Sequence, residues 1–210
     1  MDRAAALARL DRRMLEAFSA RTVAALRASL PLRLAVPRLE QVLRQNLDKE
    51  ARKDALVIGR AAQALAAGAL PGPDAVQQLL DAARRIDRDF IARLGGFPLR
   101  IEIPYARIEP LRRRRIGCGL DFAYRILDTW HRGGRLREAY PPPEFEHRLL
   151  AILTLYCEET VALADTARLP GPLARVGERL ASRLLQVMTA ASLSLAHDIA
   201  RSVIAAQKRP

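Results

Sequence analysis

Residues 107–132 read RIEPLRRRRIGCGLDFAYRILDTWHR, and this stretch combines a helical pattern with four consecutive cations. One stripe follows the period of an α-helix and contains Leu111, Arg115, Cys118, Phe122, Ile126 and Trp130. Arg113 and Arg114 fall on the opposite, polar side, and Arg112 lies at the border. Arg115 is therefore the cation that the pattern turns toward the interior, where a charge requires a partner.

The rest of the chain shows the same helical periodicity. Ala, Leu and Arg dominate the 210 residues, half of the residues are hydrophobic, and β-branched residues are scattered singly. All three dominant types are strong helix formers, so we predict an all-α protein, an antiparallel bundle of about six helices. The predicted helices cover residues 3–29, 37–68 with a break near 46–48, 74–94, 107–132, 143–167 and 172–207.

One segment does not follow the helical pattern. Residues 98–104 alternate apolar and polar side chains between two prolines, and no other run offers a partner strand. We therefore predict an extended connector near 97–104 rather than a sheet. The chain is expected to form a single helical domain over 1–210, with subdomains 1–96 and 105–210 as the alternative division.

A second charge is misplaced in the helix predicted for 143–167. Glu159 continues the apolar stripe of that helix. If this helix and the preceding one form an antiparallel hairpin, residues whose numbers sum to about 275 lie at one level, because both helices rise equally per residue. Arg115 then lies level with Glu159, and Cys118 lies level with Cys157. We predict a semi-buried ion pair between Arg115 and Glu159.

This pair has two interpretations. The structural one is a device that fixes the register of the bundle, and the functional one is a ligand or anion site formed by Arg115, Glu159 and Tyr156. We favour the structural interpretation. Gly117 and Gly119 would allow close helix approach at this level, or would instead kink the helix. The two cysteines are interpreted as small buried hydrophobes rather than a redox dithiol.

The net charge of +12 suggests anionic partners. The excess lies in residues 1–60 and 98–140, where acidic residues interleave with basic ones. No helix-turn-helix pattern is present, so nucleic-acid binding would depend on phosphate contacts. The candidate basic patch is Arg107, Arg112, Arg113, Arg114 and Arg125.

Several classes are disfavoured by missing patterns. The N-terminus does not resemble a signal peptide, and no apolar run reaches the length of a membrane span. With only two cysteines, a reduced cytoplasmic location is expected. Glu144 and His147 have the spacing of a di-iron pair, but a second pair is missing, so we predict no metal site and no cofactor. No nucleophile motif or phosphate loop accompanies His197-Asp198, so we predict no catalytic residues and lean against an enzyme.

The last predicted helix, 172–207, is apolar or small nearly all round between Leu184 and Ala196. Such a helix belongs in the centre of a bundle or in a dimer interface. Our leading expectation is therefore a non-catalytic helical protein that acts through a protein partner or as a homodimer built on residues 172–207. The alternatives are nucleic-acid binding through the arginines, and an enzyme or ligand binder with a pocket between helices around Arg115 and Glu159.

Overall fold

The computed structural model describes residues 2–29, 36–93, 105–164 and 174–207, and within these ranges the chain forms seven helices and no strand. The all-α prediction is therefore confirmed. The helices are α1 (Arg3–Ser29), α2 (Val36–Ala66), α3 (Pro73–Arg93), α4 (Tyr105–His131), α5 (Leu136–Ala139), α6 (Pro142–Ala164) and α7 (Ala174–Gln207). The predicted connector at 97–104 lies outside the described residues.

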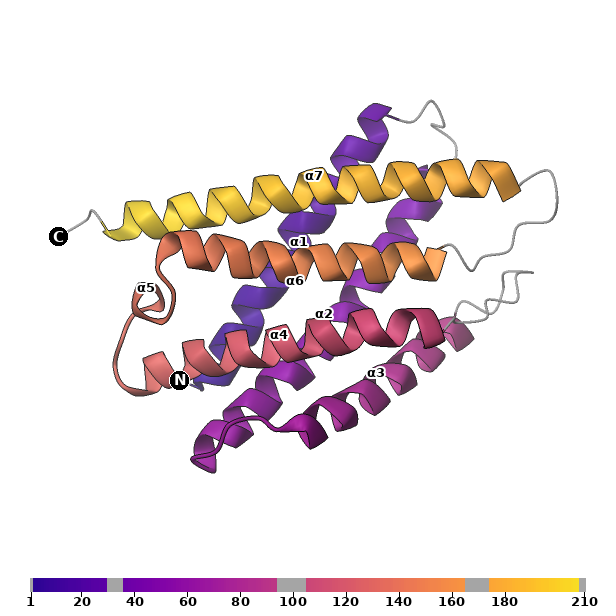
Figure 1. Cartoon of the computed structure of the whole chain (residues 1–210). Helices are drawn as coiled ribbons and strands as arrows, with labels where there is room; N and C mark the ends of the chain where they lie inside the picture. The colour runs from indigo at the N-terminus through magenta and orange to yellow at the C-terminus, as the bar shows by residue number, and fades with distance from the viewer. Residues whose placement is uncertain (1, 30–35, 94–104, 165–173, 208–210) are drawn as a thin grey trace.

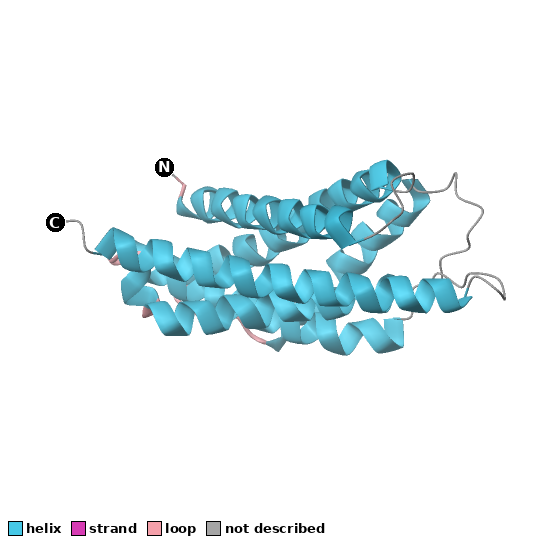
Figure 2. Cartoon of the chain, turned by 90° about the horizontal axis from the view of Figure 1, so that it is seen from above, coloured by secondary structure: helices cyan, strands magenta, loops and turns pink. Residues whose placement is uncertain are grey.

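The long helices form two layers. Helices α4, α6 and α7 lie side by side, and α3 lies next to α4 at the lower edge of this layer (Figure 1). Helices α1 and α2 pack against each other and cross the first layer at a steep angle (Figures 1 and 2). The two layers are joined mainly by contacts of α2 with α4 and of α1 with α7. Helices from 1–96 and from 105–210 thus pack directly on one another.

Glycines follow the ends of two helices. Gly68 follows α2 with a φ of 64°, and Gly133 follows α4 with a φ of 80°. Both angles lie in the left-handed region that glycine adopts without steric cost, which explains why each helix ends there. The segment 133–143, expected to be a loop, contains the short helix α5, after which Tyr140 is fully buried and stacks on Phe122.

The break expected near Asn46, Leu47 and Asp48 is wrong, because α2 continues through these residues. The Asn46 side chain donates a hydrogen bond to the Tyr156 hydroxyl at 2.9 Å, and Asp48 accepts one from Arg12 at 3.0 Å. Both polar side chains are therefore satisfied by neighbouring helices and do not compete with the helix backbone.

The two glycines of α4 differ in their surroundings. A Cβ atom at Gly119 would lie 3.3 Å from Cγ1 of Val57 on α2, whereas a Cβ at Gly117 would meet nothing within 4 Å. Close approach at this level is thus a property of Gly119 alone, and it brings α4 near α2 rather than near α6. Helix α4 is continuous from Tyr105 to His131, so the two glycines do not interrupt it.

This difference predicts different outcomes for two matched substitutions. Gly117→Ala is expected to raise the free energy of unfolding by about 1 kcal/mol, because alanine has the better helix propensity and has room there. Gly119→Ala should gain less or lose stability, since the new methyl group presses on Val57. Urea denaturation of both variants measures this, and an equal gain at the two positions would refute the packing argument.

Helix α7 is only partly buried. One face packs on α6 and α1 and buries Val187, Met188, Ala191, Leu195 and Ala196. Among the α7 side chains whose burial is described, the opposite face exposes mostly small or polar residues, and Leu193 is the large apolar residue there at 52% exposure. Ser192 is buried and donates to the Met188 carbonyl, as expected for a serine within an apolar helix.

Candidate functional site

Seven of the described charged side chains are buried where the two layers meet. We call Lys49, Glu50 and Lys53 of α2, Asp87 of α3, Arg112 and Arg115 of α4, and Glu159 of α6 the charge cluster. None of them is more than 5% exposed. Burying an ion is costly unless nearby opposite charges compensate for its lost hydration. The cluster meets this requirement by combining four cations with three carboxylates.

Glu159 holds the two arginines of α4. The Arg112 Nε donates to Glu159 Oε1 at 2.8 Å, and the Arg115 Nε lies 3.4 Å from Oε2. The predicted ion pair between Arg115 and Glu159 is therefore present. Arg112, which the helical pattern placed at the border, is 1% exposed and lies closer to Glu159 than Arg115 does. Two of the four consecutive arginines thus point inward.

Lys53 connects the remaining carboxylates. Its Nζ lies 2.7 Å from Asp87 Oδ1 and 2.9 Å from Glu50 Oε1. Arg112 reaches Asp87 Oδ2 at 2.5 Å, and the Arg115 Nη2 donates to Glu50 Oε2 at 2.7 Å. The ion pairs therefore join α2, α3, α4 and α6 in one network.

The cluster favours the ionised forms of Glu50 and Asp87. Burial would raise the pKa of Glu50, but Lys53, Lys49 and Arg115 outweigh it and hold that pKa well below the usual value. The pKa of Asp87 is likewise lowered, because Lys53, Lys49 and Arg112 outweigh its burial. Burial lowers the pKa of Lys49, which also lies 4.9 Å from the Phe90 ring centroid.

A small apolar pocket of about 60 Å³ adjoins the cluster. Its walls come from α1, α2, α4 and α6 and include Leu7, Met14, Val57, Ile116, Phe122 and Ile152. Its polar lining consists of Asp11 from α1, Asp54 from α2 and Arg115 from α4. Arg115 is thus shared between the cluster and the pocket.

The two aspartates of the pocket have few partners. The Asp54 Oδ1 lies 4.0 Å from Arg115, beyond hydrogen-bond distance, and Asp11 makes no hydrogen bond or ion pair with a described residue. Burial raises the pKa of Asp54 to about 6. Burial, with help from the charge of Asp54, raises the pKa of Asp11 well above its usual value. These two carboxyls therefore hold protons more tightly than free aspartate does.

The raised pKa of Asp54 predicts a pH-dependent stability effect. The folded state binds the Asp54 proton more tightly than the unfolded chain does. Protonation of Asp54 therefore contributes fully to the free energy of unfolding below about pH 4, and this contribution is lost as pH rises through about 6. Asp54→Asn removes that loss and should stabilise the protein at pH 8 by about 1–3 kcal/mol, and much less at pH 4. Thermal unfolding across this pH range tests it, and a constant difference would contradict it.

The other predicted site residues are placed as follows. Tyr156 is buried with its ring centroid 5.6 Å from the Arg115 Cζ, and its hydroxyl accepts from Asn46. Arg115, Glu159 and Tyr156 are therefore brought together. Only Arg115 lines the pocket, whereas Glu159 and Tyr156 support Arg115 without being part of the wall.

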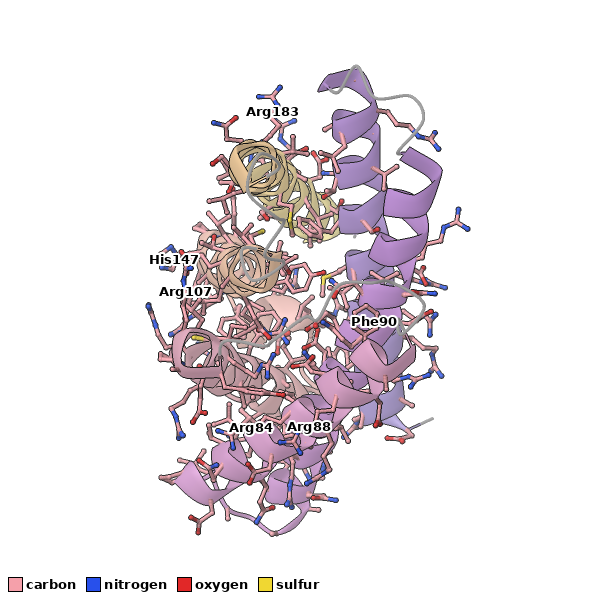
Figure 3. The ribbon with its side chains drawn as sticks, turned by 90° about the vertical axis from the view of Figure 1, so that its right-hand side faces the viewer. Arg84, Arg88, Phe90, Arg107, His147 and Arg183 are labelled. Carbon is pink, nitrogen blue, oxygen red and sulfur yellow. The ribbon has the colours of Figure 1, made fainter. Side chains whose placement is uncertain are left out.

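The predicted basic patch requires one correction. Arg112 is buried and paired with Asp87 and Glu159, so it does not belong to the surface. Arg107, Arg113, Arg114 and Arg125 are exposed (Figure 3 labels Arg107). Arg113 contacts Glu109, and Arg125 contacts Glu144, so part of this positive charge is neutralised locally.

The remaining candidates have ordinary surroundings. Cys118 and Cys157 are free thiols, and burial raises the pKa of Cys157 to about 11. His197 lies near Glu146, while Asp198 pairs with Arg21. Within the described ranges, no three His, Cys, Asp or Glu side chains are grouped so as to hold a metal ion.

Fold and site together define a helical bundle with an internal charge cluster and an adjoining pocket. No protein-family model, curated protein or solved structure matches the chain. Among the described helices, none has the length and apolar content needed to cross a bilayer.

The cluster residues that sequence reasoning missed are Lys49, Glu50, Lys53, Asp87 and Arg112. The rarity of lysine could have pointed to Lys49 and Lys53, because the 35 basic residues of the chain include only these two lysines and Lys208. Two of these three lie four residues apart on one face of α2, and both are buried. Asp87 likewise continues the buried positions Leu80 and Ala83 of α3.

Proposed function

We propose that the protein binds a small molecule in the pocket between α1, α2, α4 and α6, without a catalytic role for the pocket residues. The observation that supports this proposal is the convergence of Asp11, Asp54 and Arg115, from three helices, at one apolar pocket. Convergent polar groups with shifted pKa values in an apolar concavity are typical of ligand sites.

The two aspartates favour binding over a purely structural role. Every member of the charge cluster has an oppositely charged partner within 3.5 Å, as expected for a device that fixes helix register. Asp11 and Asp54 lack such partners and instead line the pocket. Local arrangements that reduce stability without a structural gain are typical of functional sites.

Two substitutions on α6 test this proposal with a matched control. Ile152 lines the pocket and Leu150 does not, although both are half-buried against the core. Butylamine, butanol and butyrate are added separately to ¹⁵N-labelled protein, and amide shifts are mapped. We expect at least one probe to shift amides around the pocket, and Ile152→Trp but not Leu150→Trp to abolish this. Absence of binding by all three probes would overturn the proposal.

The other expected roles receive less support from the described surface. Partner binding or homodimerisation through 172–207 would favour a large exposed apolar patch. The large hydrophobic residues described as exposed are Leu10, Leu56, Leu70 and Leu193, which belong to α1, α2, the α2–α3 turn and α7. Nucleic-acid binding through Arg107, Arg113, Arg114 and Arg125 stays a prediction and would weaken steeply with salt. A cytoplasmic location is likewise a proposal.

A further inference from the structure

We infer that the ligand of this pocket carries a cationic nitrogen, an ammonium group on a short apolar chain, seated against Asp11 and Asp54. This inference rests on the proposed binding function and names its ligand class. It follows from the charge count, the unused hydrogen-bonding capacity and the size of the pocket.

The charge count leaves one carboxylate in excess. The cluster holds four cations and three carboxylates, and Asp54 supplies a fourth negative charge next to Arg115. Asp11 is a fifth carboxyl at the same place, and no described cation pairs with it within 4 Å. Among the described residues, the ionised site is therefore one positive charge short, and a cationic ligand would supply it.

The unused hydrogen-bonding capacity also points to a donor. A carboxylate accepts through two oxygens, and neither Asp11 nor Asp54 receives a hydrogen bond from a described residue. Arg115, in contrast, donates to Glu50 at 2.7 Å and contacts Glu159 at 3.4 Å. An ammonium group brings three donors and no acceptor. An anionic ligand would find its cation already engaged and would face two carboxyls.

The size of the pocket sets the shape of the ligand. One water occupies roughly 10–15 Å³ on the same volume scale, so a cavity of about 60 Å³ holds only a few heavy atoms. The side chains Val57, Ile116 and Phe122 suit methylene groups rather than further polar atoms. The pocket therefore fits the end of a primary alkylamine.

The net charge of +12 opposes a cation at long range. At physiological ionic strength, however, screening reduces interactions beyond about 8 Å, so the adjacent carboxylates dominate. The charged groups near the bound nitrogen are Asp11 from α1, Asp54, Glu50 and Lys53 from α2, Arg115 from α4 and Glu159 from α6.

Binding is coupled to a proton. In the free pocket, burial and, to a smaller extent, the charge of Asp54 raise the pKa of Asp11 well above its usual value, so a proton on Asp11 is favoured. An arriving ammonium favours the doubly ionised pair, so this proton passes to solvent. The affinity for butylamine should therefore rise from pH 5 to pH 8.

Calorimetric titration tests the ligand class, with butylamine, butanol and butyrate as cationic, neutral and anionic probes of equal length. At pH 8 we expect butylamine to bind at least about tenfold more tightly than the other two. Titrations in buffers of different ionisation enthalpy should show proton release. The double variant Asp11→Asn, Asp54→Asn should lose the preference, and Asp89→Asn, at an exposed site of α3, should keep it.

The outcomes distinguish an error in the ligand class from an error in the proposed binding function. If butanol or butyrate binds in the pocket as tightly as butylamine, the pocket is a ligand site and the inference is overturned. If none of the probes binds, both fail. Should the double variant not fold, Asp54→Asn, which we expect to be stable at pH 8, replaces it. A preference unchanged in that variant would also overturn the inference.

Discussion

Glu159→Gln is expected to lower the free energy of unfolding by about 3–5 kcal/mol, among the largest effects of any single substitution in this chain. In the wild-type protein, Arg112 and Arg115 are buried and contact the Glu159 carboxylate. The substitution leaves both guanidinium groups buried next to a neutral amide. Neither guanidinium can lose its proton to escape the penalty. Domains of this size are typically stable by about 5–15 kcal/mol, so the variant should be close to unfolding.

The control for this substitution is the adjacent residue. Glu158→Gln removes the same charge from an exposed position of α6 and should change stability by less than about 0.5 kcal/mol. Chemical denaturation at several pH values gives both numbers. Because arginine does not titrate in this range, the loss in Glu159→Gln should be nearly the same at pH 5 and pH 8. A loss below about 1 kcal/mol would show that the cluster is not an energetic unit.

Lys53→Met should lower the free energy of unfolding at pH 8 by a comparable amount, about 3–5 kcal/mol, because it removes a buried cation instead of a buried carboxylate. The Lys53 Nζ contacts Asp87 at 2.7 Å, Glu50 at 2.9 Å and Glu159 at 3.7 Å, and methionine leaves these carboxylates with fewer cations. Lys53 is a leading cause of the low pKa values of Glu50 and Asp87. Both pKa values therefore rise in the variant.

This rise gives Lys53→Met a pH signature that Glu159→Gln lacks. Since the folded variant takes up protons more readily than the folded wild-type protein, the stability difference should shrink as pH falls from 8 toward 5. Arg52→Met, at the neighbouring exposed position, is the matched control and should have little effect. If the Lys53→Met loss did not change with pH, the carboxylates would not be responsible for it.

The helices could be predicted from the sequence because their signals are local. Apolar periodicity and Gly or Pro stops gave ranges close to those of α1, α3 and α7. The pairing of Arg115 with Glu159 was also predictable, because the two residues are at similar distances in sequence from the middle of the connection between α4 and α6. The one false break, near Asn46, arose because its hydrogen bond to Tyr156 joins residues 110 positions apart.

The partners of the remaining cluster residues could not be predicted, because these partners depend on how the layers cross. Lys49, Glu50 and Lys53 read as a solvated charged turn of α2 until α3, α4 and α6 are placed around it. Arg112 lies one step from the polar side of its helix, and the positions of Asp87 on α3 and Glu159 on α6 turn it inward. Periodicity gives the faces of a helix and does not give the neighbours of those faces.

The pocket depends on the same information. Asp11 and Asp54 belong to α1 and α2 and become significant only where these helices cross α4 next to Arg115. The charge cluster therefore has a structural role at the pocket. By fixing Arg115 through Glu50 and Glu159, it holds one wall of the pocket rigid, as a binding site requires.

The most direct test of the account is a crystal structure of the protein grown with butylamine at pH 8. We predict electron density for the amine inside the pocket, with its nitrogen within hydrogen-bond distance of Asp11 and Asp54 and its chain against Val57 and Phe122. A pocket without the amine, or an amine seated only on the outer surface, would contradict it.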